Sequence, residues 1–320
     1  MLRYWMFRIA AAVVPVVPMR IARPVAVALG TLLWALAGAQ RQRVTANLRH
    51  VPSLAGDERR LRGAGRGVFQ HLALNYLDFF RGAYLTESEV LSGWIIENQD
   101  VFEAIVAKGR GVILLGGHFG NFEQALSRLG ALNYTTVTPV ERMKPEAVFE
   151  LFRRLREHHG MHLVPADNRD SLREMTDTLK RGELVAFLAD RYVLGSSADV
   201  PFFGEPARLP TGPFALAQRT GAPTVCAFSW REGPGRAHGI FLPLAVDDDE
   251  ARRAATSTPE RSRTERTDRE ARVARLQRAY VAQLERMIAA HPEQWVATLY
   301  PIWEARRTEE VRTEAQEVSA

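Results

Sequence analysis

The chain has 320 residues, 46% of them hydrophobic and 25% charged, with a formal net charge of +5 at pH 7. These values are typical of a folded globular protein with a large core. The single cysteine, Cys226, excludes a disulfide framework and a cysteine-based zinc site. Because it lies in the apolar run PTVCAFSW, we interpret it as a buried core residue rather than a nucleophile.

The positive charge is concentrated at the start of the chain. Residues 1–56 contain seven Arg and no acid, whereas the remainder has 35 basic against 37 acidic side chains. Apolar and aromatic residues such as Trp5, Phe7 and Trp34 separate these arginines. This pattern is typical of a segment attracted to anionic lipids at a membrane surface. Nucleic-acid binding would favour polar residues between the arginines, so we predict no nucleic-acid partner.

Residues 1–56 are predicted to form membrane-associating helices. The longest uncharged run, 24–40, has 17 residues and lies at the short limit for spanning a bilayer core of about 30 Å. A signal peptide is disfavoured because Arg20 and Arg23 interrupt the apolar region. We interpret the segment as two helices lying on the cytoplasmic face of the cell membrane, in a peripheral or monotopic protein. A true span and helices packed into the globular core are the alternatives.

Residues 57–304 are predicted to form the main domain, which is helical up to about residue 110. Phe69, Leu72, Tyr76 and Phe80 share one face of a helix over 69–84. Short apolar runs then alternate with helical segments. The predicted strands are 111–116, 134–139, 161–165, 184–189, 223–229 and 239–244, and the predicted helices lie near 121–131, 145–158, 169–181 and 212–220.

This alternation predicts an α/β fold with a mostly parallel central sheet covered by helices on both faces. In such sheets ligands bind outside the carboxyl ends of the strands. His118 follows one strand, and Asp190 and Arg191 follow another. We therefore expect two strand ends to converge on one pocket.

The end of the chain combines polar and apolar segments. Residues 246–270 are highly charged and are predicted to form a flexible insertion. A final helix follows, with Val273, Leu276, Tyr280, Leu284 and Met287 in one apolar stripe. The segment HPEQWVATLYPIW then supplies Trp295 and Trp303 to the core or the membrane rim. Residues 305–320 are predicted to be a disordered tail.

The stretch GVILLGGHFGNFE places His118 and Glu123 just after a strand. A carboxylate on the Nδ1 proton of the histidine leaves Nε2 ready to take a proton from a substrate hydroxyl, as in a catalytic triad whose serine is supplied by the substrate. The alternative is a helix-capping histidine beside a solvated glutamate. Spacing alone does not separate the two interpretations.

Other catalytic motifs are absent from the sequence. It contains no G-x-S-x-G nucleophile elbow, no Walker A motif and no G-x-G-x-x-G turn. The histidines of HHGMH, at 158–162, resemble metal ligands, but no nearby acid completes a known spacing. We interpret them as surface and strand-start residues and predict no metal site.

Six motifs resemble a known family. They are RVTANLRHV, GVILLGGHFGNFE, ERMKPEAVFELFRRLREHHG, LVAFLADR, VPFFGEPARLPTGPFALAQRTGAP and HPEQWVATLYPIW, which span nearly the whole chain in order. The chain resembles the lysophospholipid-acyltransferase-like superfamily, in the branch of the lipid A late acyltransferases and the phosphatidylinositol mannoside acyltransferases. The resemblance implies transfer of a fatty acyl chain from acyl-CoA or acyl carrier protein to a hydroxyl of a membrane glycolipid. It implies no metal and no bound cofactor.

The resemblance also assigns roles to residues. His118 is expected to be the general base, with Glu123 as its orienting acid. Asp190 and Arg191 match the family's acid–arginine pair, and Glu141 and Arg156 match charged residues that line the site. The mannoside branch usually has Glu where this chain has Asp190 and Asp where it has Glu123, whereas the lipid A branch commonly has Glu at the latter position. The chain mixes both patterns, so the acceptor stays open between the two types.

Transfer from a thioester builds an oxyanion that requires positive charge or N–H donors. Arg191, Arg156 and the backbone amides of Gly116 and Gly117 are the candidates, and each arginine has a surface ion pair as its alternative. Glu205 is a candidate contact for headgroup sugars or a loop-stabilising residue. The helix 69–84 and the turn at 202–203 are candidates for lining an acyl groove. A lipid-ester hydrolase and a non-catalytic lipid-binding protein are the alternative functions.

Overall fold

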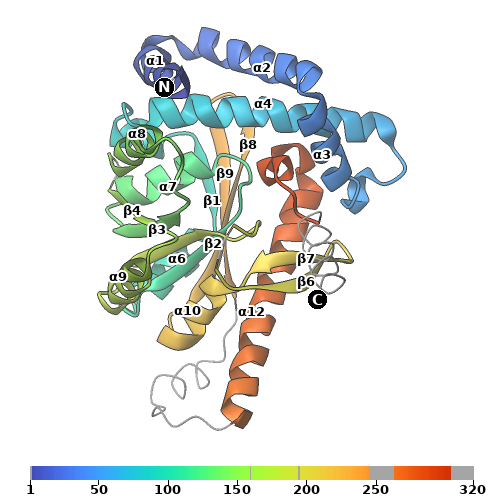
Figure 1. The fold of residues 1–320 in the computed structure, drawn as a ribbon. Helices are drawn as coiled ribbons and strands as arrows, with labels where there is room; N and C mark the ends of the chain where they lie inside the picture. The colour runs from blue at the N-terminus through green and yellow to red at the C-terminus, as the bar shows by residue number, and fades with distance from the viewer. Residues whose placement is uncertain (1, 159, 194, 245–262, 304–320) are drawn as a thin grey trace.

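A seven-stranded sheet lies at the centre of the computed structural model, with helices on both faces (Figure 1). The structure describes residues 2–158, 160–193, 195–244 and 263–303. The strand order is β1-β9-β8-β2-β5-β3-β4, and only the β8–β9 pair is antiparallel. The sheet strands are β1 (Trp94–Glu97), β2 (Val112–Gly116), β3 (Thr136–Val140), β4 (Met161–Pro165), β5 (Leu184–Leu188), β8 (Thr224–Gly233) and β9 (Arg236–Leu244). The predicted α/β class with a mostly parallel sheet is confirmed.

All six predicted strands are present, and three others were missed. β1 has only four residues and lies in a region whose pattern is helical. β6 (Ser197–Phe202) and β7 (Glu205–Pro210) form a separate antiparallel hairpin. Their sequences, SADVPF and EPARLP, contain proline, which is disfavoured inside sheets. Because the strands were predicted from continuous apolar runs, these proline-containing strands were not recognised.

Helices cover the two faces of the sheet. Alternate residues of β2 explain the division, because Ile113 and Leu115 belong to the core on one face and Leu114 to a smaller core on the other. The four helices predicted between the strands are confirmed as α7, α8, α9 and α10. The helices over the sheet are α6 (Gln99–Val106), α7 (Phe122–Ala131), α8 (Glu146–Glu157), α9 (Arg169–Lys180), α10 (Gly212–Thr220) and α12 (Arg263–Ala290), and a short α5 (Glu87–Leu91) precedes β1.

A long helix, α4 (Glu58–Gly82), lies across the upper end of the sheet (Figure 1). Asp57 caps its first turn by accepting from the backbone N–H groups of Arg59 and Arg60. Its 25 residues make it about 37 Å long, enough to cross most of the domain. The predicted helix 69–84 is the C-terminal half of α4. Phe79 and Phe80 pack against Phe152 of α8.

The N-terminal helices lie on the outer side of α4 (Figure 1). They are α1 (Leu2–Val13) and α2 (Met19–Leu36), joined by the short 3-10 helix η1 (Val14–Val16). α2 packs closely on α4, since a Cβ at Gly30 would lie 2.6 Å from the backbone of Phe69 and Gln70. Its other side exposes a continuous apolar face. The exposed large apolar residues of α2 are Met19, Ile21, Val25, Leu29, Leu32, Leu33 and Leu36.

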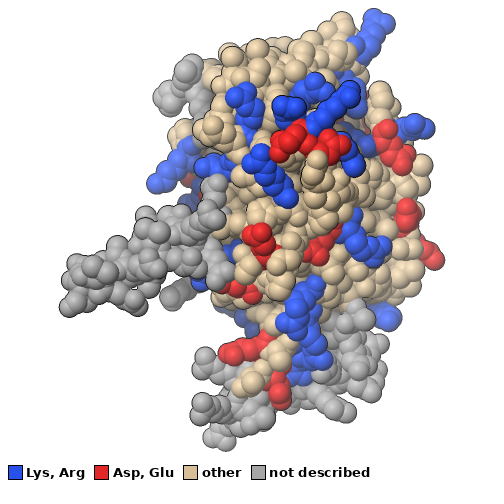
Figure 2. All heavy atoms as spheres, turned by 90° about the vertical axis from the view of Figure 1, so that its right-hand side faces the viewer, with Lys and Arg blue, Asp and Glu red and all other residues tan. Residues whose placement is uncertain are grey.

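The length and the apolar composition of α2 are relevant to membrane association. By length and composition, α2 is the one described helix that could cross a bilayer. Figure 2 shows that the upper edge of the molecule is largely uncharged and that Lys and Arg side chains gather just below it. α3 (Gly38–Leu48) behaves differently, because its Val44 and Leu48 lie in the main core. Within residues 1–56, the exposed apolar side chains therefore belong to α1, η1 and α2.

Two segments near the end of the chain lie outside the described residues: 245–262, most of the predicted flexible insertion, and 304–320, which includes the predicted tail. Residues 263–270, the last part of the predicted insertion, form the first turns of α12. The predicted stripe on this helix is confirmed, since Leu276, Tyr280 and Leu284 are buried in the main core. Two 3-10 helices follow, η3 (Pro292–Gln294) and η4 (Val296–Leu299), and η2 (Pro52–Leu54) precedes α4.

Candidate active site

His118 lies in a tight loop between β2 and α7, at the carboxyl end of the fully buried strand β2. Gly120 makes the loop possible, because its φ is +62° and a Cβ there would lie 1.8 Å from the carbonyl oxygen of Ser229. The neighbouring strand β5 ends two residues before Asp190. Since β2 and β5 are parallel and paired along their full length, their carboxyl ends bring His118 and Asp190 together.

His118 and Asp190 form a direct side-chain pair. His118 Nδ1 lies 2.7 Å from Asp190 Oδ1, and the backbone N–H of His118 donates to Oδ2 at 2.8 Å. The indole Nε1–H of Trp295 also donates to Oδ2, at 3.1 Å. Asp190 is fully buried, whereas the His118 side chain is 21% exposed. The predicted convergence of two strand ends is therefore confirmed.

This pairing defines the proton positions. Burial raises the pKa of Asp190. The nearby His118 and the hydrogen bonds from His118 and Trp295 lower it by more, so the net pKa lies below its usual value. An ionised carboxylate only accepts hydrogen bonds, so His118 Nδ1 carries the proton. The lone pair of the ring is then on Nε2. His118 can therefore act as a base at Nε2.

The predicted pairing of His118 with Glu123 is wrong. Glu123 is the second residue of α7 and makes a two-point ion pair with Arg156 of α8, at 3.0 Å to Nε and 2.5 Å to Nη2. The left-handed Gly120 turns the chain between the two residues, so that His118 faces Asp190. The pKa of Arg156 is lowered by burial and raised more strongly by Glu123, for a net increase. Glu123 and Arg156 join α7 to α8.

A second ion pair lies beside Asp190. Arg191 Nη2 donates to Glu141 Oε2 at 3.1 Å, and the guanidinium lies 4.0 Å from the centre of the Tyr300 ring. Arg191 is largely buried, and its Nε–H has no partner among the described groups. Arg191, which directly follows Asp190 in the chain, therefore keeps one buried donor that no described group uses.

The remaining predicted site residues lie in two places. Gly116 ends β2 and Gly117 begins the His118 loop, and both line an apolar cavity. The Gly116 carbonyl accepts from the Tyr280 hydroxyl at 2.7 Å. Glu205 instead begins β7 in the separate hairpin, where its Oε2 lies 3.6 Å from His50 Nδ1. The structure does not bring Glu205 to the His118 loop.

The apolar cavity lies between α7 and the sheet, beside His118. It holds about 710 Å³ of empty space, including its open mouth, and its lining is mostly apolar. Small residues on the sheet make room for it: Gly116, Ala186, Ala227 and Gly239. Phe122 of α7 lines it and contacts the His118 ring edge-on, with the ring centres 5.5 Å apart.

A family model for the bacterial lipid A biosynthesis acyltransferases matches residues 1–303. The chain belongs to this family. It is 29% identical over 222 residues to the phosphatidylinositol mannoside acyltransferase of Mycobacterium tuberculosis (strain ATCC 25618 / H37Rv), a match covering 69% of this chain and 63% of that protein. A second protein of the same name, from Mycolicibacterium smegmatis, is 33% identical over 153 residues, which cover 47% of this chain and 50% of that protein.

In this member of the lipid A acyltransferase family, residues 294–296 hold the His118 loop in place. Trp295 is fully buried and donates to Asp190. The Gln294 carbonyl accepts from the Gly120 N–H at 2.9 Å, and the Val296 N–H donates to the His118 carbonyl at 2.9 Å. From the sequence, Trp295 is expected only in the core or at the membrane rim. Its role as a donor to Asp190 was missed, because no local pattern links residues 105 positions apart.

A buried arginine supports the same loop from the other side. Arg231 of β8 donates to the Gly120 carbonyl at 3.2 Å and to Asn75 Oδ1 of α4 at 2.6 Å, and it forms an ion pair with Asp78. Its Nη1 also lies 3.3 Å from His71 Nδ1. The network therefore connects α4, the helix under the apolar face, to the His118 loop.

The environment of His71 gives a pH prediction. Burial and the charges of Arg231, Arg23 and His291 lower the pKa of His71 from 6.5 to about 3. The unfolded chain therefore binds more protons than the folded chain between these values, and stability falls as pH falls, by up to about 1.4 kcal/mol per pH unit. We expect His71→Gln to reduce this dependence, as measured by urea unfolding between pH 7 and pH 5. An identical slope in both proteins contradicts the assignment.

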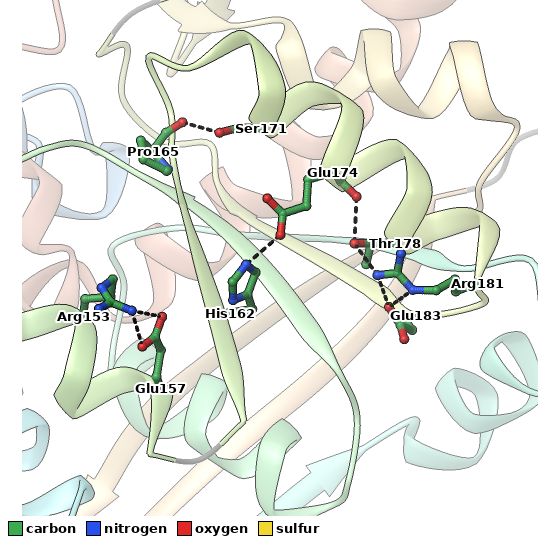
Figure 3. Close-up of polar contacts among 9 residues, drawn as sticks. All are labelled: Arg153, Glu157, His162, Pro165, Ser171, Glu174, Thr178, Arg181 and Glu183. Carbon is green, nitrogen blue, oxygen red and sulfur yellow. Dashed lines mark hydrogen bonds and ion pairs between the residues drawn. The ribbon is translucent and has the colours of Figure 1, made fainter.

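The histidines of 158–162 show no sign of a metal site in the described part of the chain. Figure 3 shows His162 of β4 directed at Glu174 of α9, and its Nε2 lies 2.6 Å from that carboxylate. The same view shows Arg153 and Glu157 paired along α8, at 2.7 Å. No group of three His, Cys, Asp or Glu side chains suited to a metal is present among the described residues.

Proposed function

We propose that this protein transfers a fatty acyl chain from a thioester donor to a hydroxyl of a membrane glycolipid, with His118 as the general base. The donor is acyl-CoA or acyl carrier protein, and the acceptor is of the phosphatidylinositol mannoside or lipid A type. The observation that carries the proposal is the pair of His118 and buried Asp190, 2.7 Å apart beside an apolar cavity. Family membership and the names of the matched relatives support it.

In the proposed reaction, His118 Nε2 takes the proton of the acceptor hydroxyl as its oxygen attacks the thioester carbonyl carbon. The new C–O bond gives a tetrahedral intermediate, and Asp190 stabilises the imidazolium through Nδ1. The C–S bond then breaks, and the leaving thiolate receives the proton from Nε2. No metal or bound cofactor is required for these steps.

The developing oxyanion needs a fixed donor. Arg156 is committed to Glu123 through two hydrogen bonds. Arg191 follows Asp190 directly and keeps a buried Nε–H without a partner among the described groups. Of the two predicted arginines, we therefore propose Arg191 as the donor to the oxyanion or to the thioester carbonyl that precedes it.

The apolar cavity suits the acyl chain. Its lining residues come from six neighbouring strands, from Ile96 of β1 to Thr138 of β3. At about 4.8 Å between strands, the six strands that contribute lining residues span about 24 Å of the sheet. The predicted groove residues on helix 69–84 and at 202–203 do not line this cavity.

Narrowing this cavity should shorten the preferred acyl chain. Ala186 of β5 lies on its floor, so Ala186→Phe should exclude the distal methylenes of a long chain, each of which contributes about 0.8 kcal/mol when buried. We expect kcat/KM for a hexadecanoyl thioester to fall at least about tenfold relative to an octanoyl thioester. The ratio within one variant controls for loss of folded protein. An unchanged ratio would place the acyl chain elsewhere.

We also propose that α1 and α2 lie on the membrane with their exposed apolar side chains in the bilayer interface. Trp5, Ile9 and Leu29 are among the exposed residues, and the acid-free segment carries the arginines that attract anionic lipids. The packing of α2 on α4 supports an interfacial helix over an isolated span. We propose the cytoplasmic face of the membrane, because acyl-CoA and acyl carrier protein, the two proposed donors, are cytoplasmic.

Product analysis tests the proposed function. The purified protein is incubated with a radiolabelled acyl thioester, with and without a glycolipid extract that contains phosphatidylinositol mannosides or lipid A precursors. We expect label to enter the glycolipid, with little free fatty acid in either sample. Free fatty acid released at the same rate without acceptor would instead identify a lipid-ester or thioester hydrolase. No turnover of any kind would favour a lipid-binding protein.

A further inference from the structure

A second cavity lies at the same end of the sheet as His118, on the other side of Trp94, which lines both cavities. It holds about 1000 Å³ of empty space, including its mouth. Its walls come from the start of α2, the end of α4, α5, the start of α7 and the turn between β8 and β9. We call it the arginine pocket, after its lining residues Arg23, Arg81, Arg231 and Arg236.

The pocket has an excess of positive charge. Asp78 is paired with Arg231, and Glu89 accepts from the backbone N–H and hydroxyl of Thr86, which cap α5. Arg81 donates through Nη1 to the carbonyls of η1 and its neighbours. Four arginines therefore face two carboxylates, both of which already have partners.

Two arginines remain uncommitted. Among the described contacts, the side chains of Arg23 and Arg236 make no hydrogen bond or ion pair with protein groups. Arg23 is half-buried at the start of α2, and its pKa is lowered by burial and by the nearby Arg231, which the attraction of Asp78 offsets only in part. Four cations close to only two carboxylates repel one another, and an added anion would relieve this repulsion. Guanidinium groups in this arrangement are suited to a phosphate, which they bind through paired hydrogen bonds.

Asn121 supplies a second, independent sign of a ligand. It lines the pocket, is only 1% exposed, and its Oδ1 has no partner among the described groups. Its Nδ2 donates to Gln124 Oε1 at 3.3 Å, which fixes the orientation of the amide. A buried amide oxygen without a donor is costly, so this position is suited to a ligand hydroxyl. The pocket thus offers cations for a phosphate and an acceptor for a hydroxyl.

The pocket lies where a lipid headgroup can reach it. Met19 and Arg23 of α2 line it, while Ile21 and Val25 of the same helix belong to the exposed apolar face. A lipid with its tails beside that face therefore has its phosphate near Arg23. Asn121 lies three residues after His118, so a sugar extending from the same headgroup is close to the base.

We propose that the arginine pocket binds the phosphodiester of the acceptor lipid, with Arg23 and Arg236 on the phosphate and Asn121 on a headgroup hydroxyl. This inference rests on the proposed function and adds where the acceptor is anchored. The phosphates of CoA have the same chemistry and are the competing source. The site explains how one protein holds a lipid headgroup at a fixed distance from His118.

Titration calorimetry with a soluble headgroup tests the proposal. Glycerophosphoinositol carries the phosphodiester and hydroxyls without the tails, so membrane partitioning does not enter the result. We expect the full-length protein to bind it and Arg23→Gln and Arg236→Gln to weaken binding about tenfold or more, since each removes charge-assisted hydrogen bonds. Arg20→Gln is the matched control, because Arg20 is exposed on the same helix and outside the pocket. Its affinity should stay within about twofold.

The outcomes separate this site from the proposed chemistry. His118→Ala should abolish acyl transfer yet bind glycerophosphoinositol normally, so a failure of catalysis leaves the binding result intact. No binding by the wild type, or equal binding by the wild type and Arg23→Gln, overturns the proposal. So does an equal loss in Arg20→Gln. If Arg23→Gln weakens the binding of CoA but not of glycerophosphoinositol, the pocket belongs to the donor and the acceptor assignment is overturned.

Discussion

Replacing Asp190 with asparagine is expected to slow acyl transfer about 1,000- to 10,000-fold while the protein stays folded. The magnitude follows the loss seen when the carboxylate of a catalytic triad becomes an amide. The substitution changes no volume, and Asp190 lies inside a network that supplies three donors to it. The loss is therefore expected in kcat rather than in binding of the acceptor.

The geometry shows why the amide fails. Oδ2 of Asp190 accepts from both the His118 backbone N–H and the Trp295 indole N–H. The single oxygen of an asparagine must take this place, so its NH₂ group faces His118 Nδ1. An NH₂ group can only donate, which forces the lone pair of the ring onto Nδ1 and the proton onto Nε2. The imidazole then has no base directed at the substrate.

Glu123→Gln is the matched control for this prediction. It also changes one buried carboxylate into an amide, but Glu123 contacts Arg156 and not His118. We expect its kcat to stay within about tenfold of the wild type. Steady-state kinetics with one thioester and one acceptor compare the two variants. An equal fall in both would return Glu123 to the role that the sequence motif assigned to it.

The sequence predicted most of the sheet because buried parallel strands are continuous apolar runs. GVILLG contains β2 and LVAFLA contains β5, and the carboxyl ends of these two strands lie side by side as expected. The hairpin β6–β7 was missed because its prolines resemble a loop. β1 was missed because a four-residue strand is too short to differ from its helical surroundings.

The site was predicted only in part, and the error has a physical cause. His118, Asp190 and Arg191 lie at adjacent strand ends, which a parallel sheet places at one edge. The choice of Glu123 over Asp190 as the partner of His118 rested on spacing along the chain. Spacing does not reveal the left-handed turn at Gly120, which separates the two residues. Nor does it reveal Arg156, which lies on another helix.

Long-range partners were beyond the sequence. Trp295 and Arg231 reach the His118 loop from segments more than 100 residues away in the chain. Each is recognisable in the structure because its side chain is buried and its polar atoms bond to the site: Trp295 donates to Asp190, and Arg231 donates to the Gly120 carbonyl. One general rule could have selected Arg231: an arginine on a strand of the central sheet must be buried, and a buried cation needs a partner.

Replacing Glu123 with leucine is expected to lower the free energy of unfolding by about 3–5 kcal/mol. Arg156 is mostly buried, with its guanidinium 5.0 Å from the centre of the Phe79 ring and 5.7 Å from that of Phe152. Without Glu123 the cation has no anion and little access to water. Removing one partner of a buried pair costs this much, chiefly through the charge left behind. Urea unfolding monitored by circular dichroism measures the loss.

The double variant Glu123→Leu with Arg156→Met identifies the cause. If the unpaired charge destabilises the single variant, removing that charge should restore most of the lost stability, since apolar side chains can replace a buried ion pair. Arg49→Leu breaks an exposed pair with Glu58 and should cost under about 1 kcal/mol. A double variant as unstable as Glu123→Leu alone would show that the carboxylate acts through shape and not through charge. Recovery would instead establish that the motif's glutamate holds α7 against α8, while Asp190 positions the histidine.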